Sequence, residues 1–145
     1  MGMVVIAYFA GGKKVISHTG GHAPRNAASA IAFAEAQIGK PYVYGAAGPG
    51  SYDCSGLVMR AYGLSQRTSE EQWAALPHTS HPRRGDLVFF VGGDTSLDPS
   101  PGHVGIYLSP HEMIDAYGYG TYVRKESFGE PGSAPGLVLV GYAIP

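Results

Sequence analysis

The chain has 145 residues, of which 44% are hydrophobic and 14% are charged, so it can bury a core of its own and intrinsic disorder is excluded. Its formal net charge is −1 and no basic cluster occurs, which argues against nucleic acid as a partner. No apolar run reaches the roughly 18 residues of a membrane span, and lysines follow residues 3–10 instead of preceding them as in a signal peptide. These properties predict a monomer with no membrane span and no readable export signal.

The first 25 residues are interpreted as an N-terminal extension. Two β-rich segments flank Gly11 and Gly12, a pattern typical of a β-hairpin. A linker rich in glycine follows, with Pro24 near its end. We therefore divide the chain into an extension, residues 1–25, and a main domain, residues 26–145.

Three helices are expected in the first half of the main domain. The first begins at Asn26, the second at Cys54 and the third just after Thr68. Their start signals are polar N-caps, and glycines follow the first two. The capping residues are Asn26 and Gly39 for the first helix, Asp53 and Gly63 for the second, and Thr68 with Glu71 for the third.

Strands are expected in the second half, where the pattern changes to β-branched and aromatic residues. The predicted strands cover residues 87–90, 103–108, 113–116, 122–124 and 137–143. Helices followed by strands, without alternation, indicate an α+β domain in which the helices pack on an antiparallel β-sheet.

The chain has one cysteine, Cys54, at the predicted start of a helix. The positive end of the helix dipole favours thiolate over thiol, and the free amides of that turn can bind an oxyanion. The small neighbours Ser55 and Gly56 would let a substrate backbone approach. A buried structural thiol is the alternative. The residues alone leave both roles open.

A nucleophilic thiol needs a base, and His103 is the candidate among six histidines. It opens a strand, and it points to the face opposite Val104 and Ile106, which we expect to be the unpacked face. A half-exposed histidine at the edge of a strand is the alternative. The others lie in turns or in segments expected in solvent, without the further ligands of a metal site: His18, His22, His78, His81 and His111.

Asp115 is the candidate that orients His103. If the hairpin loop has three residues, 109–111, Leu108 pairs with Glu112 and the Asp115 side chain shares the face of His103. A two-residue loop would place Asp115 on the other face. Because proline cannot take the positive φ of the tight hairpin turns, the longer loop is favoured.

Several motifs in this order resemble a known family. They are YVYG at 42–45, DCSGLV at 53–58, RTSEEQ at 67–72, RGDLVFF at 84–90, GHVGIY at 102–107 and MIDA at 113–116. Together they resemble the NlpC-type cell-wall peptidases, papain-like cysteine endopeptidases of bacteria and their phages. The resemblance covers about residues 26–143, and it makes residues 26–145 the expected catalytic domain.

The resemblance implies a half-papain fold and hydrolysis of an amide in the peptidoglycan stem peptide, most often between γ-D-glutamate and a diamino acid. Cys54 would be the nucleophile, His103 the base and then the acid, and Asp115 the orienting residue. The family's oxyanion and substrate contacts carry over to Tyr44, Asp53, Ser55 and Arg67. No metal or organic cofactor is implied.

Other functions stay open. The same triad serves an amidase or acyltransferase on a substrate outside the wall, and a non-catalytic wall-binding module is a further alternative. The chain can also be an interbacterial toxin or a phage lysin delivered by other machinery, with an inhibitor or immunity protein as partner. The loop of residues 92–101 is expected either to form a wall of the groove or to be solvated.

Overall fold

The computed structural model describes residues 3–8, 14–19, 26–92, 100–129 and 137–145. In these ranges the helices are α1 (Ala27–Ala36), α2 (Cys54–Tyr62) and α3 (Ser69–Ala75). The strands are β1 (Met3–Tyr8), β2 (Lys14–Thr19), β3 (His78–Thr79), β4 (Leu87–Gly92), β5 (His103–Ser109), β6 (Glu112–Asp115), β7 (Arg124–Ser127) and β8 (Leu137–Ala143).

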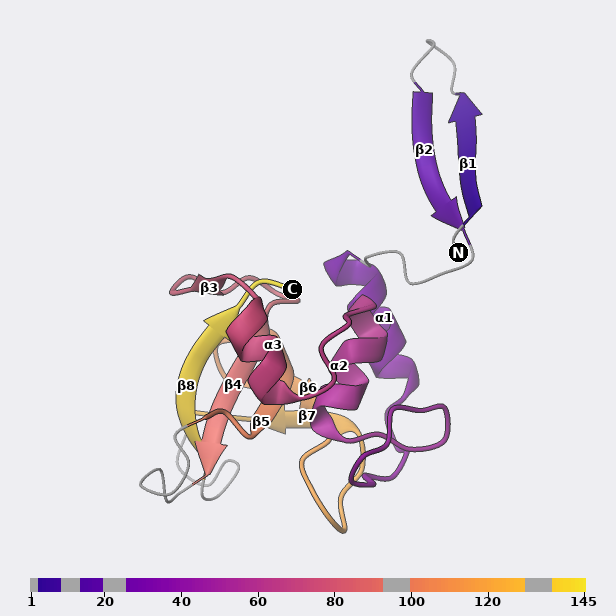
Figure 1. The fold of residues 1–145 in the computed structure, drawn as a ribbon. Coiled ribbons are helices and arrows are strands. Elements are labelled where there is room, and N and C mark those ends of the chain that lie inside the picture. Colours follow the sequence, from indigo (N-terminus) through magenta and orange to yellow (C-terminus); the bar gives the residue numbers. More distant parts are fainter. Residues whose placement is uncertain (1–2, 9–13, 20–25, 93–99, 130–136) are drawn as a thin grey trace.

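The main sheet has the strand order β3-β8-β4-β5-β6-β7, with antiparallel neighbours throughout. The three described helices pack on one face of it (Figure 1). This arrangement confirms the α+β prediction. Strands β1 and β2 pair antiparallel in a sheet of their own, which confirms the predicted hairpin. The turn at Gly11 and Gly12, the linker and most of the 92–101 loop lie outside the described residues.

Helix α2 forms as its sequence predicts. The Asp53 carboxylate accepts the Gly56 N–H at 2.7 Å, and Gly63 ends the helix in the left-handed conformation with φ 68°. The inward face is fully buried and consists of Leu57, Val58 and Ala61. Helix α3 likewise begins at its predicted cap, Thr68, which accepts the Glu71 N–H.

Helix α1 ends earlier than predicted. Asn26 caps its start by accepting the Ser29 N–H at 2.9 Å, as expected. Its C-cap, however, is Gln37 and not Gly39. Gly39 lies in the following turn, where its N–H bonds to the carbonyl of Val123. The Gly39 amide therefore pairs with a residue distant in sequence and does not cap the helix.

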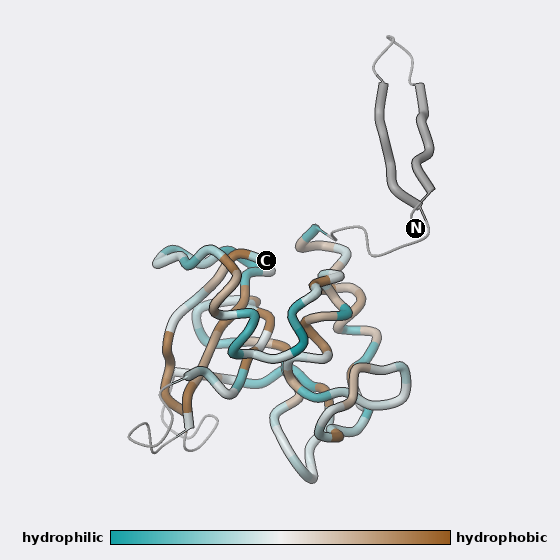
Figure 2. Tube along the Cα trace, in the orientation of Figure 1, coloured by the Kyte–Doolittle hydropathy of each residue, from teal (hydrophilic) through white to brown (hydrophobic). Residues whose placement is uncertain are grey.

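Both faces of the sheet are covered at β4 and β5, which corrects the expectation of an unpacked face at His103. The helices cover one face, whose core includes Val104 and Ile106. On the other face Val88, Phe90, Tyr107, Met113 and Phe128 form a second cluster. In Figure 2 hydrophobic stretches follow β4, which is buried, and β8, whose hydrophobic residues are largely exposed. Strands buried on both sides leave His103 only 5% exposed.

The β5–β6 hairpin reaches the predicted register by a different turn. Ser109 pairs with Glu112 across a two-residue turn, and a β-bulge between Tyr107 and Ser109 then shifts the pairing. Beyond the bulge Ile106 pairs with Ile114, as it would after a three-residue loop. The predicted loop was therefore wrong, but the faces of His103 and Asp115 were right. Strand β7 also starts later than predicted, at Arg124.

Gly56→Ala should destabilise the fold. A Cβ at this position would collide with the carbonyl oxygen of Ala46 and lie 2.9 Å from Asp53 Oδ1. Gly56 is thus small because the 45–47 loop packs on it, which corrects the idea that it admits substrate. Overpacking of this kind costs about 1–3 kcal/mol. Thermal unfolding measures it, with Gly50→Ala as the control because its Cβ would meet nothing within 4 Å. Equal melting temperatures would contradict the prediction.

Candidate active site

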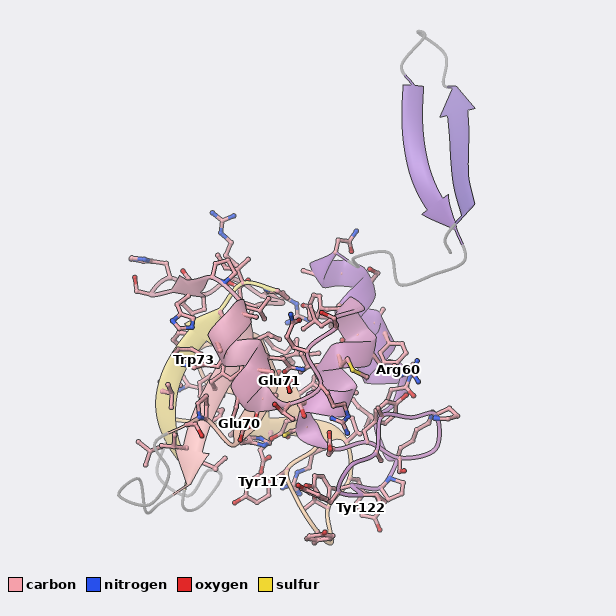
Figure 3. The ribbon with its side chains drawn as sticks, viewed as in Figure 1. Arg60, Glu70, Glu71, Trp73, Tyr117 and Tyr122 are labelled. Atoms are coloured by element: carbon pink, nitrogen blue, oxygen red, sulfur yellow. The ribbon has the colours of Figure 1, made fainter. Side chains whose placement is uncertain are left out.

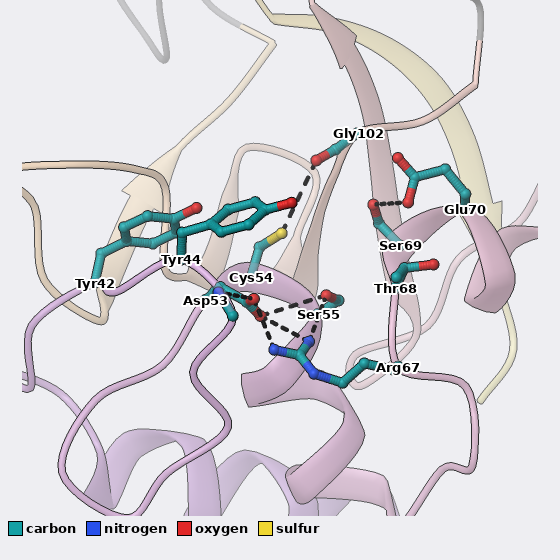
Figure 4. Close-up of a pocket in the computed structure, with 11 residues that line it drawn as sticks. Tyr42, Tyr44, Asp53, Cys54, Ser55, Arg67, Thr68, Ser69, Glu70 and Gly102 are labelled. Carbon is teal, nitrogen blue, oxygen red and sulfur yellow. Dashed lines mark hydrogen bonds and ion pairs between the residues drawn. The ribbon is translucent and has the colours of Figure 1, made fainter.

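Cys54 is the first residue of α2 and is partly exposed. Its Sγ lies 4.0 Å from the carbonyl oxygen of Gly102, the residue before β5 (Figure 4). Because Cys54 begins the helix, the positive end of the α2 dipole lies next to its sulfur. A thiol that borders two pockets at a helix N-terminus has the surroundings of a reactive cysteine and not those of a core residue.

His103 and Asp115 meet across β5 and β6, as the register predicted. His103 Nε2 lies 2.7 Å from Asp115 Oδ2, and the two side chains are 7% and 0% exposed. Since Nε2 bonds to the carboxylate, Nδ1 is the nitrogen left for a second partner. Burial by itself would lower the pKa of His103, but hydrogen bonds to Asp115 and Cys54, together with their charges, outweigh burial and raise it to about 10. The three predicted residues are thus in one cluster.

Two pockets meet at Cys54. Tyr42, Cys54 and Gly102 border both of them. One, with a volume of about 280 Å³, runs past Ser55 and Arg67 toward α3, where Ser69 and Glu70 border it. The other runs past His103 and the partly buried Tyr117, a residue that Figure 3 labels. A chain lying across Cys54 would therefore have one side against the α2–α3 connection and the other against the histidine.

Asp53, Ser55 and Arg67 are interlocked in the first pocket (Figure 4). Arg67 binds both oxygens of Asp53, with Nη1 at 3.0 Å from Oδ1 and Nη2 at 2.8 Å from Oδ2. Its Nη1 also donates to Ser55 Oγ at 3.1 Å. The hydrogen bond to Asp53 raises the pKa of Arg67. The structure thus brings the three predicted residues to the pocket, and much of their polar surface is used to fix the loop before α2.

Tyr44 lies at the rim of the same pocket and is 76% exposed. Tyr42, which borders both pockets, is partly buried and is not among the site residues predicted from the sequence. Burial, followed by the negative charges of Cys54 and Asp53, raises the pKa of Tyr42 to about 12. Its hydroxyl thus keeps its proton in the field of the sulfur. The sequence does contain a hint of Tyr42, because the order Tyr42, Val43, Tyr44 can place both tyrosines on the same side of an extended segment. Which of the two is buried depends on tertiary packing.

The other described histidines lie elsewhere. His78 stacks on Trp73 with ring centroids 3.6 Å apart, and its Nε2 bonds to the Trp73 carbonyl. His81 and His111 are exposed. In the part of the chain that the structure describes, no group of three metal-binding side chains occurs, and no helix there is long and apolar enough to cross a membrane.

Asp115→Asn should lower the pKa of His103. Loss of a nearby negative charge has an effect of roughly one to three pH units, which an NMR titration of the imidazole nitrogens measures. Glu35→Gln, on the exposed side of α1, is the charge-matched control and should leave this titration in place. A His103 titration equal in wild type and Asp115→Asn would show that the carboxylate does not act on the imidazole.

The raised pKa of His103 also predicts how the stability of the wild type depends on pH. Because the pKa of folded His103 is raised above 6.5, its stabilising effect is present below pH 6.5 and is lost as the pH rises through about 10. The fall in melting temperature between neutral and alkaline pH should therefore be larger for the wild type than for Asp115→Asn. An equal fall in both proteins would contradict this.

The chain is similar to known proteins in sequence and in fold. Residues 39–141 match the model of the NlpC/P60 family. The chain is 38% identical over 118 residues to a Listeria grayi protein named "Probable endopeptidase p60", covering 76% of this chain and 21% of that one. It is 35% identical over 107 residues to the Escherichia coli (strain K12) protein "Probable endopeptidase YafL", covering 67% of this chain and 42% of that protein.

A solved structure shares the fold. The structure described as the peptidoglycan hydrolase RipB from Mycobacterium tuberculosis aligns with a TM-score of 0.60 and 30% identity over 77% of this chain and 62% of that one. The chain spans about a fifth of the Listeria relative and less than half of the Escherichia coli relative. With a family match over more than two thirds of its residues, this chain belongs to the NlpC/P60 family.

Proposed function

We propose that this chain is a cysteine endopeptidase that hydrolyses an amide in peptidoglycan stem peptides, at the bond between γ-D-glutamate and the diamino acid. The observation that carries the proposal is a cluster of three residues. Cys54 lies at a helix N-terminus, its hydrogen bond and charge help to raise the pKa of His103, and Asp115 bonds to the other nitrogen of the imidazole. The names of the relatives support the reaction class and the wall as substrate. These names do not specify which bond is cut, so the choice of the γ-D-glutamate bond is our own proposal.

The geometry gives each group a step in an acyl transfer. The Cys54 thiolate attacks the carbonyl carbon, and the carbonyl oxygen becomes an oxyanion. The imidazolium of His103 then gives its Nδ1 proton to the amide nitrogen, the C–N bond breaks and the amine leaves. His103, now neutral, takes a proton from water, whose oxygen attacks the thioester and releases the acid and the thiolate. Asp115 keeps Nδ1 aimed at the sulfur throughout.

The two pockets take the two sides of the scissile bond. Because His103 protonates the leaving amine, the pocket that it borders takes the diamino acid. The pocket of Asp53, Ser55 and Arg67 then takes the acyl side, with γ-D-glutamate. These residues hold the substrate through the lone pairs and N–H groups that their mutual bonds leave over, and their interlocking keeps them in place before substrate arrives.

Tyr42 is our candidate for the second oxyanion donor, beside the Cys54 amide, in place of the predicted Tyr44. Loss of one oxyanion donor lowers kcat by about 100-fold or more. We expect this loss for Tyr42→Phe with KM little changed, and a much smaller loss for Tyr44→Phe, because Tyr44 is 76% exposed. Steady-state kinetics on a stem-peptide substrate compares the two variants. The larger loss in Tyr44→Phe would restore the original assignment.

Other features of the proposal follow from the substrate. Action on peptidoglycan would take place in the cell envelope of the chain's own cell or of a target cell. We further propose that the chain acts as a monomer and that residues 1–25 are an extension outside the catalytic domain. An interbacterial toxin or phage lysin would use the same chemistry. An amidase or acyltransferase acting outside the wall is the second candidate, because the residues that border the pocket near Cys54 do not by themselves define a wall peptide.

Digestion of purified peptidoglycan tests the function. The wild type should release fragments that end at D-glutamate in mass spectrometry, and Cys54→Ala should release none. Since the chain has one cysteine, labelling by iodoacetamide reports whether Cys54 is reactive in the same preparation. A labelled protein that releases no fragments would overturn the wall substrate and favour the second candidate. Fragments released by both proteins would overturn cysteine catalysis.

A further inference from the structure

The carboxylate behind His103 has a second oxygen that the catalytic cluster does not use. Asp115 Oδ2 bonds to His103, whereas Oδ1 is buried without a hydrogen-bond partner in the described part of the chain. Asp115 is fully buried. An unpaired buried carboxylate oxygen is costly, so a donor for Oδ1 has to be sought among its neighbours.

Glu126 is the neighbour that has a matching need. In the β6–β7 pair Asp115 is opposite Arg124 and Met113 is opposite Glu126, so Glu126 lies on the face of Asp115, one diagonal step away. Its side chain is 11% exposed, and its Oε2 is the other carboxyl oxygen of this face that is buried without a partner in the residues described. Two buried carboxyl groups thus each have one unpaired oxygen at neighbouring positions.

The remaining oxygen of Glu126 has a partner. Arg124 Nη2 lies 2.7 Å from Glu126 Oε1. Arg124 is 44% exposed, so its charge is partly solvated and offsets a buried negative charge only in part. If both carboxyl groups were ionised, two negative charges would face each other in a buried site with one partly screened cation. A single proton between them removes that repulsion and pairs both free oxygens.

We propose that Glu126 is protonated at Oε2 and donates this hydrogen bond to Asp115 Oδ1, as a positioning residue behind the catalytic histidine. The proposal rests on the proposed roles of Cys54, His103 and Asp115. The series then closes: Arg124 donates to Glu126, Glu126 donates to Asp115, and His103 donates to the other oxygen of Asp115. Asp115 is held at both oxygens, and its orientation, which sets the direction of the imidazole, is fixed.

The electrostatics of the described groups support this assignment. Burial raises the pKa of Glu126, the negative charge of Asp115 raises it further, and Arg124 acts in the opposite direction. These are the charged groups that face Glu126 from β6 and β7, with His103 on β5 behind Asp115. Burial and Asp115 together outweigh Arg124, so the carboxyl group binds its proton more tightly than an exposed glutamate does.

Glu126→Gln and Glu126→Ala test the proposal in opposite ways. The amide of Gln is neutral, donates to Asp115 and accepts from Arg124, so this variant should react with iodoacetate at Cys54 within about threefold of the wild-type rate and keep the NMR titration of His103. Ala leaves Asp115 Oδ1 unpaired and frees Arg124 to approach the carboxylate. It should slow the reaction about tenfold, the effect of one lost hydrogen bond, and shift the His103 titration to lower pH.

Glu112→Gln is the matched control, since Glu112 is an exposed carboxylate on the same strand as Asp115. It should change neither the rate nor the titration. Infrared difference spectra between wild type and Glu126→Gln should also show the C=O band of a protonated carboxyl group at neutral pH, present only in the wild type. Circular dichroism and thermal unfolding show whether Glu126→Ala is folded. If it is not, Glu126→Gln and the infrared band carry the test.

Three outcomes would overturn the proposal. The first is a His103 titration that moves to lower pH in Glu126→Gln, because it would mean that Glu126 acts by its negative charge. The second is the absence of the protonated C=O band. The third is a folded Glu126→Ala with the wild-type rate and titration. None of these measurements uses a wall substrate, so their failure is distinct from a failure to digest peptidoglycan.

Discussion

A buried imidazole needs a partner for each nitrogen, and in this chain the sheet supplies one and the helix the other. The 2.7 Å bond between His103 and Asp115 joins β5 to β6 inside a layer that is covered on both faces. It fixes which nitrogen faces Cys54 and raises the pKa of the ring. The register of the hairpin, the bulge that sets this register and the burial of the strands all act on the chemistry through this one contact.

The helix side of the site is held by a different set of contacts. Asp53 has three tasks: it caps α2, accepts the Gly45 N–H at 3.0 Å and receives the two-pronged bond of Arg67. These contacts fasten the 45–53 loop to the start of the helix, and the close approach of Ala46 at Gly56 leaves no room for a side chain there. The pocket next to Cys54 is therefore preformed, because the Asp53 carboxylate both lines the pocket and caps α2.

The main sheet also explains why polar groups are found behind the site. β6 and β7 lie at one edge of the six-stranded sheet, and β7 is largely exposed. The edge allows Arg124 to reach solvent, while the side chain of Glu126 beside it is only 11% exposed. The position of Asp115 one strand from the edge is thus what makes a second carboxyl group tolerable.

The sequence by itself determined what depends on local signals. The start of α2 at Cys54, the caps Asn26, Asp53 and Thr68, the β1–β2 hairpin and the common face of His103 and Asp115 were all predictable, because capping side chains and period-two alternation act over a few residues. The order of the motifs was sufficient for the family. The end of α1 was not predictable, because Gly39 is held by Val123, far away in sequence.

Tertiary structure alone decided the environment of these residues. The burial of His103 depends on the second cluster of side chains, on the sheet face away from the helices, which no local sequence pattern predicts. The preference for Tyr42 over Tyr44 depends on which of the two side chains is more buried, and the meeting of Glu126 with Asp115 depends on the pairing of β6 with β7. Sequence patterns specify which way a side chain points along its own element. Exposure, partners and charge state are set by what packs against that element, and this requires the whole chain.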